Sequence, residues 1–204
     1  MKRSDFIKAI SASIFFGAGA EVMEAARAAS VADVPKNSSK GAKMNGKKML
    51  VVYYSWSGNT RCVADFTAKL TGADVLEVVP EKAYPKSYSR TVDIAKKEVY
   101  AQYKPAIKTK ISNLKDYGLA FVGSPNWWGT ISSPIRTFLS ENDFSGISIA
   151  PFMTHEGSAM GRAVDDIRKI CRDSKVLAAL PIRGGSVKKS EKTVENWLRQ
   201  QGAI

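Results

Sequence analysis

Short apolar runs alternate with helical patterns from residue 47 to the end of the chain. The run at residues 49–54, Met-Leu-Val-Val-Tyr-Tyr, is rich in β-branched and aromatic side chains without polar alternation, which predicts a strand buried on both faces. Further runs predict strands at residues 74–79, 119–124, 148–154 and 176–182. Helical spacing of apolar residues predicts helices at residues 61–70, 91–103, 133–139, 162–171 and 191–201. Strands that alternate with helices through short connections predict an α/β fold, with a parallel sheet covered on both faces.

The hexapeptide at residues 55–60, Ser-Trp-Ser-Gly-Asn-Thr, joins the first predicted strand to the first predicted helix. Unpaired N–H groups at a helix start favour an anion, Gly58 lets the backbone approach closely, and hydroxyl groups add donors. The segment therefore predicts a phosphate site that needs no lysine. A turn of this composition can also merely cap its helix. It matches neither a Walker A loop nor a G-x-G-x-x-G fingerprint.

Ligands of open parallel sheets bind beyond the carboxyl ends of the strands, so the loops after the first, third and fourth strands should converge. The loop at residues 124–130 carries two adjacent tryptophans, Trp127 and Trp128, which form either a local lid or a platform for a flat ligand. The loop after the fourth strand carries His155 and Glu156, each ordinary when taken alone. Together the three loops predict a pocket for a planar ring with a phosphorylated tail.

Charge and composition narrow the function classes. The chain has 204 residues and a net charge of +12, and residues 47–204 hold 24 Lys/Arg against 15 Asp/Glu, a surplus of +9. A charge surplus of this size affects which partners the protein attracts, but it says nothing about the fold. No nucleic-acid-binding signature accompanies it, so we expect an acidic protein or a small anionic substrate instead. Cys62, Cys171 and the single His155 allow no disulfide framework or multi-histidine metal site, and we expect both cysteines to be buried free thiols.

The N-terminal region has the order of an export signal. Lys2, Arg3 and Lys8 precede an apolar run at residues 9–20, and small residues follow. The start resembles a twin-arginine signal, but Ser4 stands in place of the second arginine. We expect an export segment at residues 1–32, a flexible linker at 33–46, a folded domain at 47–204 and a periplasmic location. The alternative is an uncleaved amphipathic helix and a cytoplasmic protein. No apolar run reaches the roughly 20 residues that span a bilayer.

Three motifs in order, Ser-x-Ser-Gly-Asn-Thr, Pro-Asn-Trp-Trp-Gly and Thr-His-Glu-Gly-Ser, resemble the flavodoxin family from about Lys48 to the C-terminus. The resemblance implies a three-layer α/β/α sandwich with a five-stranded parallel sheet of order 2-1-3-4-5, bound FMN and redox chemistry. By position, the phosphate would be held by Ser55, Ser57, Gly58, Asn59 and Thr60, with Arg61 near it. One side of the ring would be flanked by Pro125, Asn126, Trp127, Trp128 and Gly129. The pyrimidine side would meet Thr154, His155, Glu156, Gly157 and Ser158.

The leading functional interpretation is an FMN-binding electron-transfer protein without catalytic residues or a metal. Positive charge on His155 near the ring would raise the flavin's potential. The alternatives are an FMN-dependent NAD(P)H:quinone-type oxidoreductase and a non-redox binding module on the same fold. Classical flavodoxins are acidic, whereas this domain is basic, so we expect an acidic redox partner protein or a small aromatic or quinone substrate. Residues 81–88 would either line the outer rim of the pocket or form an ordinary turn.

Overall fold

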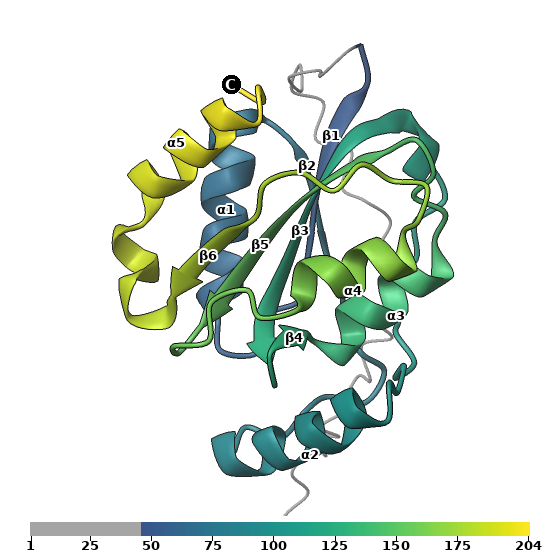
Figure 1. The fold of residues 1–204 in the computed structure, drawn as a ribbon, viewed down its shortest axis with the longest axis vertical. Coiled ribbons are helices and arrows are strands. Elements are labelled where there is room, and N and C mark those ends of the chain that lie inside the picture. The colour runs from purple at the N-terminus through teal and green to yellow at the C-terminus, as the bar shows by residue number, and fades with distance from the viewer. Residues whose placement is uncertain (1–45) are drawn as a thin grey trace, which may run out of the picture. The chain divides into compact units, whose positions relative to one another are not determined.

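The computed structural model describes residues 46–204. The predicted export segment, and the predicted linker up to residue 45, lie outside the described residues. The long strands are β1 (Lys48–Tyr53), β2 (Asp74–Glu77), β3 (Tyr117–Trp127), β5 (Ser148–His155) and β6 (Leu180–Arg183). They form a parallel sheet of order β2-β1-β3-β5-β6 (Figure 1). The order implied by the resemblance is therefore confirmed, since β5 and β6 are the fourth and fifth long strands.

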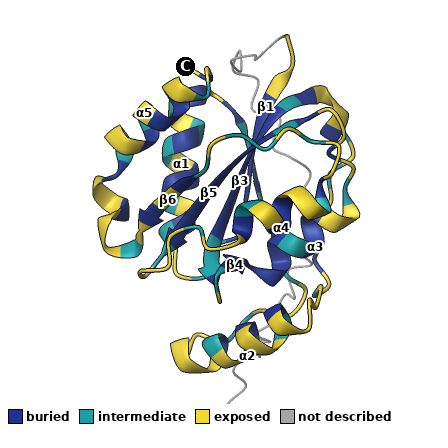
Figure 2. Cartoon of the chain, viewed as in Figure 1, coloured by how far each residue is buried: buried dark blue, intermediate teal, exposed yellow. Residues whose placement is uncertain are grey.

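Helices cover both faces of this sheet. The helices are α1 (Asn59–Thr71), α2 (Tyr88–Tyr100), α3 (Ser133–Glu141), α4 (Ala163–Ile170) and α5 (Glu191–Gln200), with short 3-10 helices η1 (Leu114–Asp116) and η2 (Gly184–Lys189). One hydrophobic core joins the sheet to α1 and α5, and the other joins it to α2, α3 and α4. Figure 2 shows the buried strands between these layers. Within residues 46–204, no helix combines the length and apolar character needed to cross a membrane.

The first strand shows why its apolar run has no polar alternation. Leu50, Val52 and Tyr54 pack into the core under α2, α3 and α4. Met49, Val51 and Tyr53 pack into the core under α1 and α5. Successive side chains point to opposite faces, and both faces are covered, so every position is apolar.

Two strand predictions need correction. The fifth strand was expected at residues 176–182, but only Val176 bridges β5 there, and β6 begins at Leu180. Between Val176 and β6, the Ala178 carbonyl accepts a hydrogen bond from the Trp197 indole on α5, 2.8 Å away. The third strand was expected to end at residue 124, but β3 runs to Trp127 and turns back as the short antiparallel β4 (Thr130–Ile131).

The two cysteines lie in different cores. Cys171 is buried under α4, and Cys62 is half-buried against the core of α1 and α5, so the expectation that both are buried holds for Cys171 alone. Burial raises the pKa of the Cys171 thiol to about 11 and also raises the pKa of the Cys62 thiol.

We expect a thiol count on unreduced, denatured protein to find both cysteines of the chain free. In folded protein, a disulfide reagent should label Cys62 first and Cys171 only on unfolding, because Cys171 is both buried and protonated at neutral pH. Loss of both thiols from the count would contradict the separation of the two cores.

Candidate cofactor-binding site

A cavity of about 930 Å³ opens at the carboxyl edge of the sheet. Its walls come from the loops after β1, β3 and β5 and from α2, which lies beyond β4 in Figure 1. The lining residues are Trp56, Ser57, Asn59, Tyr88, Thr91, Val92, Ala95, Pro125, Asn126, Trp127, Trp128, Gly129, Thr154, His155, Glu156, Gly157 and Ser158. The three loops selected from the sequence therefore meet around one space, as the parallel topology requires.

The start of α1 leaves backbone donors free at one end of this cavity. The first intrahelical bond runs from the Cys62 N–H to the Gly58 carbonyl (3.0 Å), so the N–H groups of residues 59–61 precede the helical ladder. The N-cap residue is Gly58, which has no side chain to cap the helix, and its N–H donates to the Ser55 hydroxyl (3.1 Å). Gly58 has a φ of 92°, a left-handed conformation that glycine adopts readily. The helix start therefore has the donors and the positive dipole end that bind an anion.

Four of the predicted phosphate-binding residues are not among those that line the cavity: Ser55, Gly58, Thr60 and Arg61. The Thr60 hydroxyl is buried and lies 2.8 Å from the Thr154 hydroxyl, a hydrogen bond that ties α1 to the end of β5. The Arg61 guanidinium forms two hydrogen bonds to the Glu77 carboxylate, of 2.6 and 2.8 Å. These two contacts fix the loop that leads into α1.

The two tryptophans have different environments. Trp127 and Thr130 pair across a two-residue turn, and positive φ values at Trp128 (51°) and Gly129 (82°) are those of a type I′ hairpin. The Trp127 side chain is only 7% exposed. Its ring packs edge-on against Tyr54 and Tyr84, at centroid distances of 5.7 and 4.9 Å. Trp127 is therefore largely a core residue, and Trp128, 40% exposed, is the aromatic wall.

One stripe of α2 holds the Trp128 indole. The ring nitrogen donates to the Val92 carbonyl (3.1 Å), and the Lys96 ammonium lies 4.7 Å from the ring centroid. Tyr100 lies one further turn along α2, with its ring centroid 6.4 Å from that of Trp128. Residues 92, 96 and 100 share a helix face, so a single helix fixes the position of this wall.

The loop after β5 is tied to the β3–β4 turn. Asn126 accepts from the Gly129 N–H and donates to the Ala159 carbonyl, both at 2.9 Å. The Arg162 N–H donates to the Gly129 carbonyl (2.7 Å). A Cβ at Gly161 would overlap that same carbonyl. The two loops therefore form one unit around the cavity.

The buried carboxylate of Asp166 stabilises these two linked loops. Asp166 accepts hydrogen bonds from Thr130 (2.5 Å) and Arg136 (3.1 Å), and Arg162 lies 3.4 Å away. Burial by itself would raise the pKa of the Asp166 carboxyl, but these hydrogen bonds and the two guanidinium charges outweigh it and lower that pKa.

The polar end of the cavity contains the single histidine. The Nδ1 atom of His155 accepts from the Gly157 N–H (3.0 Å), which leaves Nε2 as the donor of a neutral ring. Glu156 and Asn59 both pack against Gly184, where a Cβ would overlap the Glu156 carboxylate. Within the described residues, no three His, Cys, Asp or Glu side chains gather as metal ligands would.

The sequence analysis missed the α2 wall and Trp56. Thr91, Val92 and Ala95 have the spacing of a helix face that packs into a core. The sequence pattern therefore could not show that this face lines a cavity. Trp56 lies within the hexapeptide, and its indole donates to the Pro85 carbonyl (2.9 Å). Tyr88 also lines the cavity, which puts the last residue of the 81–88 segment at the rim.

Comparison with known proteins agrees with this architecture. The family described as Flavodoxin matches residues 48–201. A provisionally named flavoprotein from Bacteroides eggerthii is 26% identical with a TM-score of 0.66, over 75% of this chain and 96% of that chain. A flavoprotein from Lactobacillus acidophilus, crystallised in complex with FMN, is 27% identical with a TM-score of 0.58, over 70% of this chain and 97% of that chain. No curated protein matches the sequence. The family match covers most of the chain, which therefore belongs to the flavodoxin family.

Proposed function

We propose that this protein binds FMN at the carboxyl edge of its sheet and transfers electrons. The observation that carries the proposal is the continuity of the site: a single cavity of about 930 Å³ joins the uncapped start of α1 to the Trp128 wall and the loop after β5. A relative of 27% identity was crystallised with FMN, and family membership supports the same cofactor here.

The residues present fit such a cofactor. The N–H groups at the start of α1, with the Ser57 and Asn59 side chains in the wall, would hold the phosphate. Trp128 and residues 154–158 would hold the ring, with the backbone of residues 125–129 beside it. FMN, when bound, supplies reversible electron uptake at its ring system. The protein's part is to bind the phosphate, orient the ring, exclude water and place the His155 Nε2–H as a donor.

FMN uptake by the full chain tests the cofactor. Titration should quench flavin fluorescence with an affinity at or below the micromolar range, and riboflavin, which lacks the phosphate, should bind at least about tenfold more weakly. Protein that takes up no FMN at micromolar concentration would contradict the proposal and favour a non-redox binding module.

Kinetics then separate a carrier from an oxidoreductase. A carrier, reduced chemically, should give its electrons quickly to an external acceptor, yet oxidise NAD(P)H slowly without a partner reductase. Sustained oxidation of NAD(P)H with a quinone acceptor would overturn electron carriage in favour of a quinone-type oxidoreductase.

Replacing Lys96 with methionine is expected to lower the midpoint potential of the bound cofactor. Lys96 stacks on Trp128, and a cation there favours electron uptake at a neighbouring ring. If the Lys96 charge stabilises the reduced cofactor over the oxidised one by about 0.5–1 kcal/mol, as a unit charge in a water-like dielectric can, the shift is roughly 10–20 mV for a two-electron couple. Lys97→Met removes the same charge from an exposed position one residue along α2, and should change the potential less. Equal shifts would mean that the contact with Trp128 is irrelevant.

A further inference from the structure

Cations without acidic partners flank the α2 side of the cavity mouth. Lys86 precedes α2, and Arg90 lies in its first turn, two residues after Tyr88, which lines the cavity, and on another face of the helix. Both cations are exposed, and neither forms an ion pair within residues 46–204. The Pro85 carbonyl accepts from Trp56 and from Thr91, which holds this segment against the mouth.

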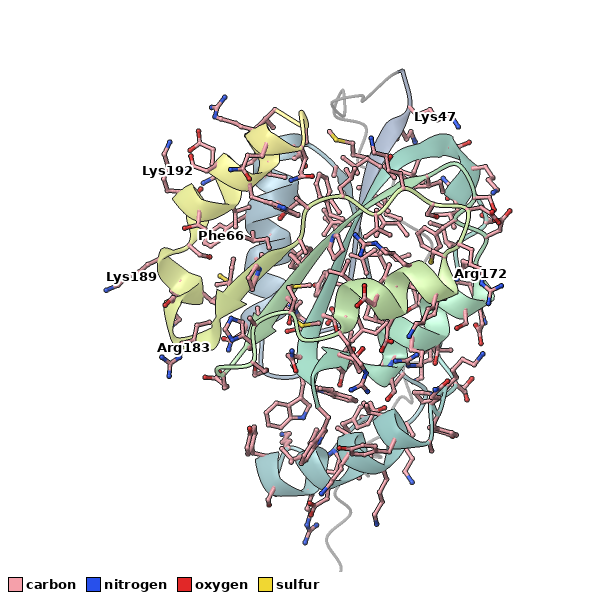
Figure 3. The ribbon with its side chains drawn as sticks, viewed as in Figure 1. Lys47, Phe66, Arg172, Arg183, Lys189 and Lys192 are labelled. Carbon is pink, nitrogen blue, oxygen red and sulfur yellow. The ribbon has the colours of Figure 1, made fainter. Side chains whose placement is uncertain are left out.

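A second group of cations lies at the end of β6, beside the loop after β5. Arg183 ends β6 and pairs in register with His155 of the cavity wall, and Lys188 and Lys189 follow in η2. All three are exposed, and none has an acidic partner among the described residues. Lys188 lies close enough to Cys62, in the first turn of α1, to lower the pKa of that thiol against the larger effect of burial. Figure 3 shows Arg183 and Lys189 projecting outward from this end of the sheet.

At the opposite edge of the sheet, part of the positive charge is neutralised by ion pairs. Three lysines there face carboxylates, in the pairs Lys48–Asp74, Lys110–Glu141 and Lys115–Asp143. Around the cavity mouth, three acidic residues have no ion pair, fewer than the five unpaired cations. They are Glu81, Asp93 and Glu156. Glu156 is in addition packed against Gly184 and Asn59. Exposed cations without an ion pair also occur away from the cavity, Arg172 and Lys175 among them, so what distinguishes the rim is its place beside the aromatic cavity mouth.

Exposed aromatic side chains line the cavity mouth. Tyr88 is 66% exposed and Trp128 40% exposed, and both line the cavity mouth with Trp56. Tyrosine, tryptophan and arginine are enriched at protein–protein interfaces, with aromatic anchors at the centre and charges at the rim. A small anion would need only one of the two cation groups, whereas a protein that covers the mouth meets both.

We propose that this rim, comprising Lys86, Arg90, Arg183, Lys188 and Lys189 around the aromatic mouth, docks a redox protein whose electron-exchanging face is acidic. The inference rests on the proposed function and names its partner class. Complementary charge on the two faces would steer the encounter and bring the partner's redox centre to the cavity.

The test uses the full chain loaded with FMN and an acidic plant-type ferredoxin, reduced with dithionite, as electron donor. Stopped-flow mixing gives the second-order rate constant at several salt concentrations. Lys86→Glu with Arg90→Glu, and separately Arg183→Glu with Lys189→Glu, should each slow the reaction by about tenfold or more at low salt, and the difference should vanish at high salt. Arg172→Glu with Lys175→Glu makes the same change in net charge at the opposite edge, where Figure 3 places Arg172, and should slow it by less than about twofold.

Equal slowing by all three double variants would overturn the proposal, because net charge alone would then explain the rate. So would slowing of electron transfer to ferricyanide, a small anion, with no effect on ferredoxin. Calorimetric titration of ferredoxin into the FMN-free full chain tests docking separately, because this measurement needs no cofactor. Salt-sensitive binding that the mouth variants lose supports the docking surface even if FMN uptake fails, and absence of binding overturns the surface even if FMN uptake succeeds.

Discussion

Replacing Gly58 with alanine is expected to weaken FMN binding by about 5- to 30-fold. Gly58 precedes α1 with a φ of 92°, a conformation that costs other residues about 1–2 kcal/mol. A Cβ there meets no atom within 4 Å, so the cost is one of backbone conformation and not of overlap. Relief of that strain would rotate the peptide groups that open the helix and turn their N–H groups away from the phosphate. Fluorescence titration with FMN measures the effect.

Gly146→Ala is the matched control. Gly146 also has a positive φ (75°) and open space around its Cβ position, but it lies in the loop before β5, at the edge opposite the cavity. We expect a similar loss of stability in both variants and a loss of FMN affinity in Gly58→Ala alone. Riboflavin affinity should change little in either, because riboflavin has no phosphate. If Gly58→Ala weakened riboflavin as much as FMN, the α1 start would not be the phosphate site.

The sheet could be predicted from the sequence because strands covered on both faces leave a distinctive pattern. The Met49 to Tyr54 run alternates between two cores, and each of its side chains packs among apolar neighbours. The start of the fifth strand could not be predicted. There the Ala178 carbonyl accepts a hydrogen bond from the Trp197 indole, 19 positions away in the sequence, and a contact with so distant a residue leaves no pattern in the 176–182 run.

The location of the candidate site could be predicted from the sequence, because it follows from the parallel topology of the sheet. Parallel strands bring the loops after β1, β3 and β5 to one edge, and the cavity lies there. The sequence did not decide which tryptophan is buried. A type I′ turn at Trp128 and Gly129 turns the Trp127 ring into the core with Tyr54 and leaves the Trp128 ring at the surface. That turn lacks the usual Asn-Gly signature, so the sequence predicts only a loop there.

Replacing Asp166 with alanine is expected to lower the free energy of unfolding by about 3–5 kcal/mol. The Arg136 side chain is only 11% exposed, and removal of its carboxylate leaves a largely buried, uncompensated charge. Arg162, whose backbone holds the Gly129 carbonyl, loses the same partner, so the β3–β4 turn should loosen and FMN should bind more weakly. Chemical denaturation and FMN titration of the same samples measure the two effects. Asp165→Ala is the control: its side chain is 66% exposed, and its pair with Arg168 is worth at most about 1 kcal/mol.

The pH dependence distinguishes a charge effect from lost packing. The folded protein lowers the pKa of the Asp166 carboxyl below its unfolded value of about 3.9, so this group stabilises the fold above that pH. The contribution disappears as the pH falls through the lower, folded pKa. The stability difference between the native protein and Asp166→Asn should therefore be largest near neutral pH and shrink in acid. Asp166→Ala combined with Arg136→Met should recover part of the loss, since no unpaired guanidinium remains at position 136. A difference that stayed constant from neutral to acid pH, with no recovery in the double variant, would mean that Asp166 acts by filling space and not by its charge.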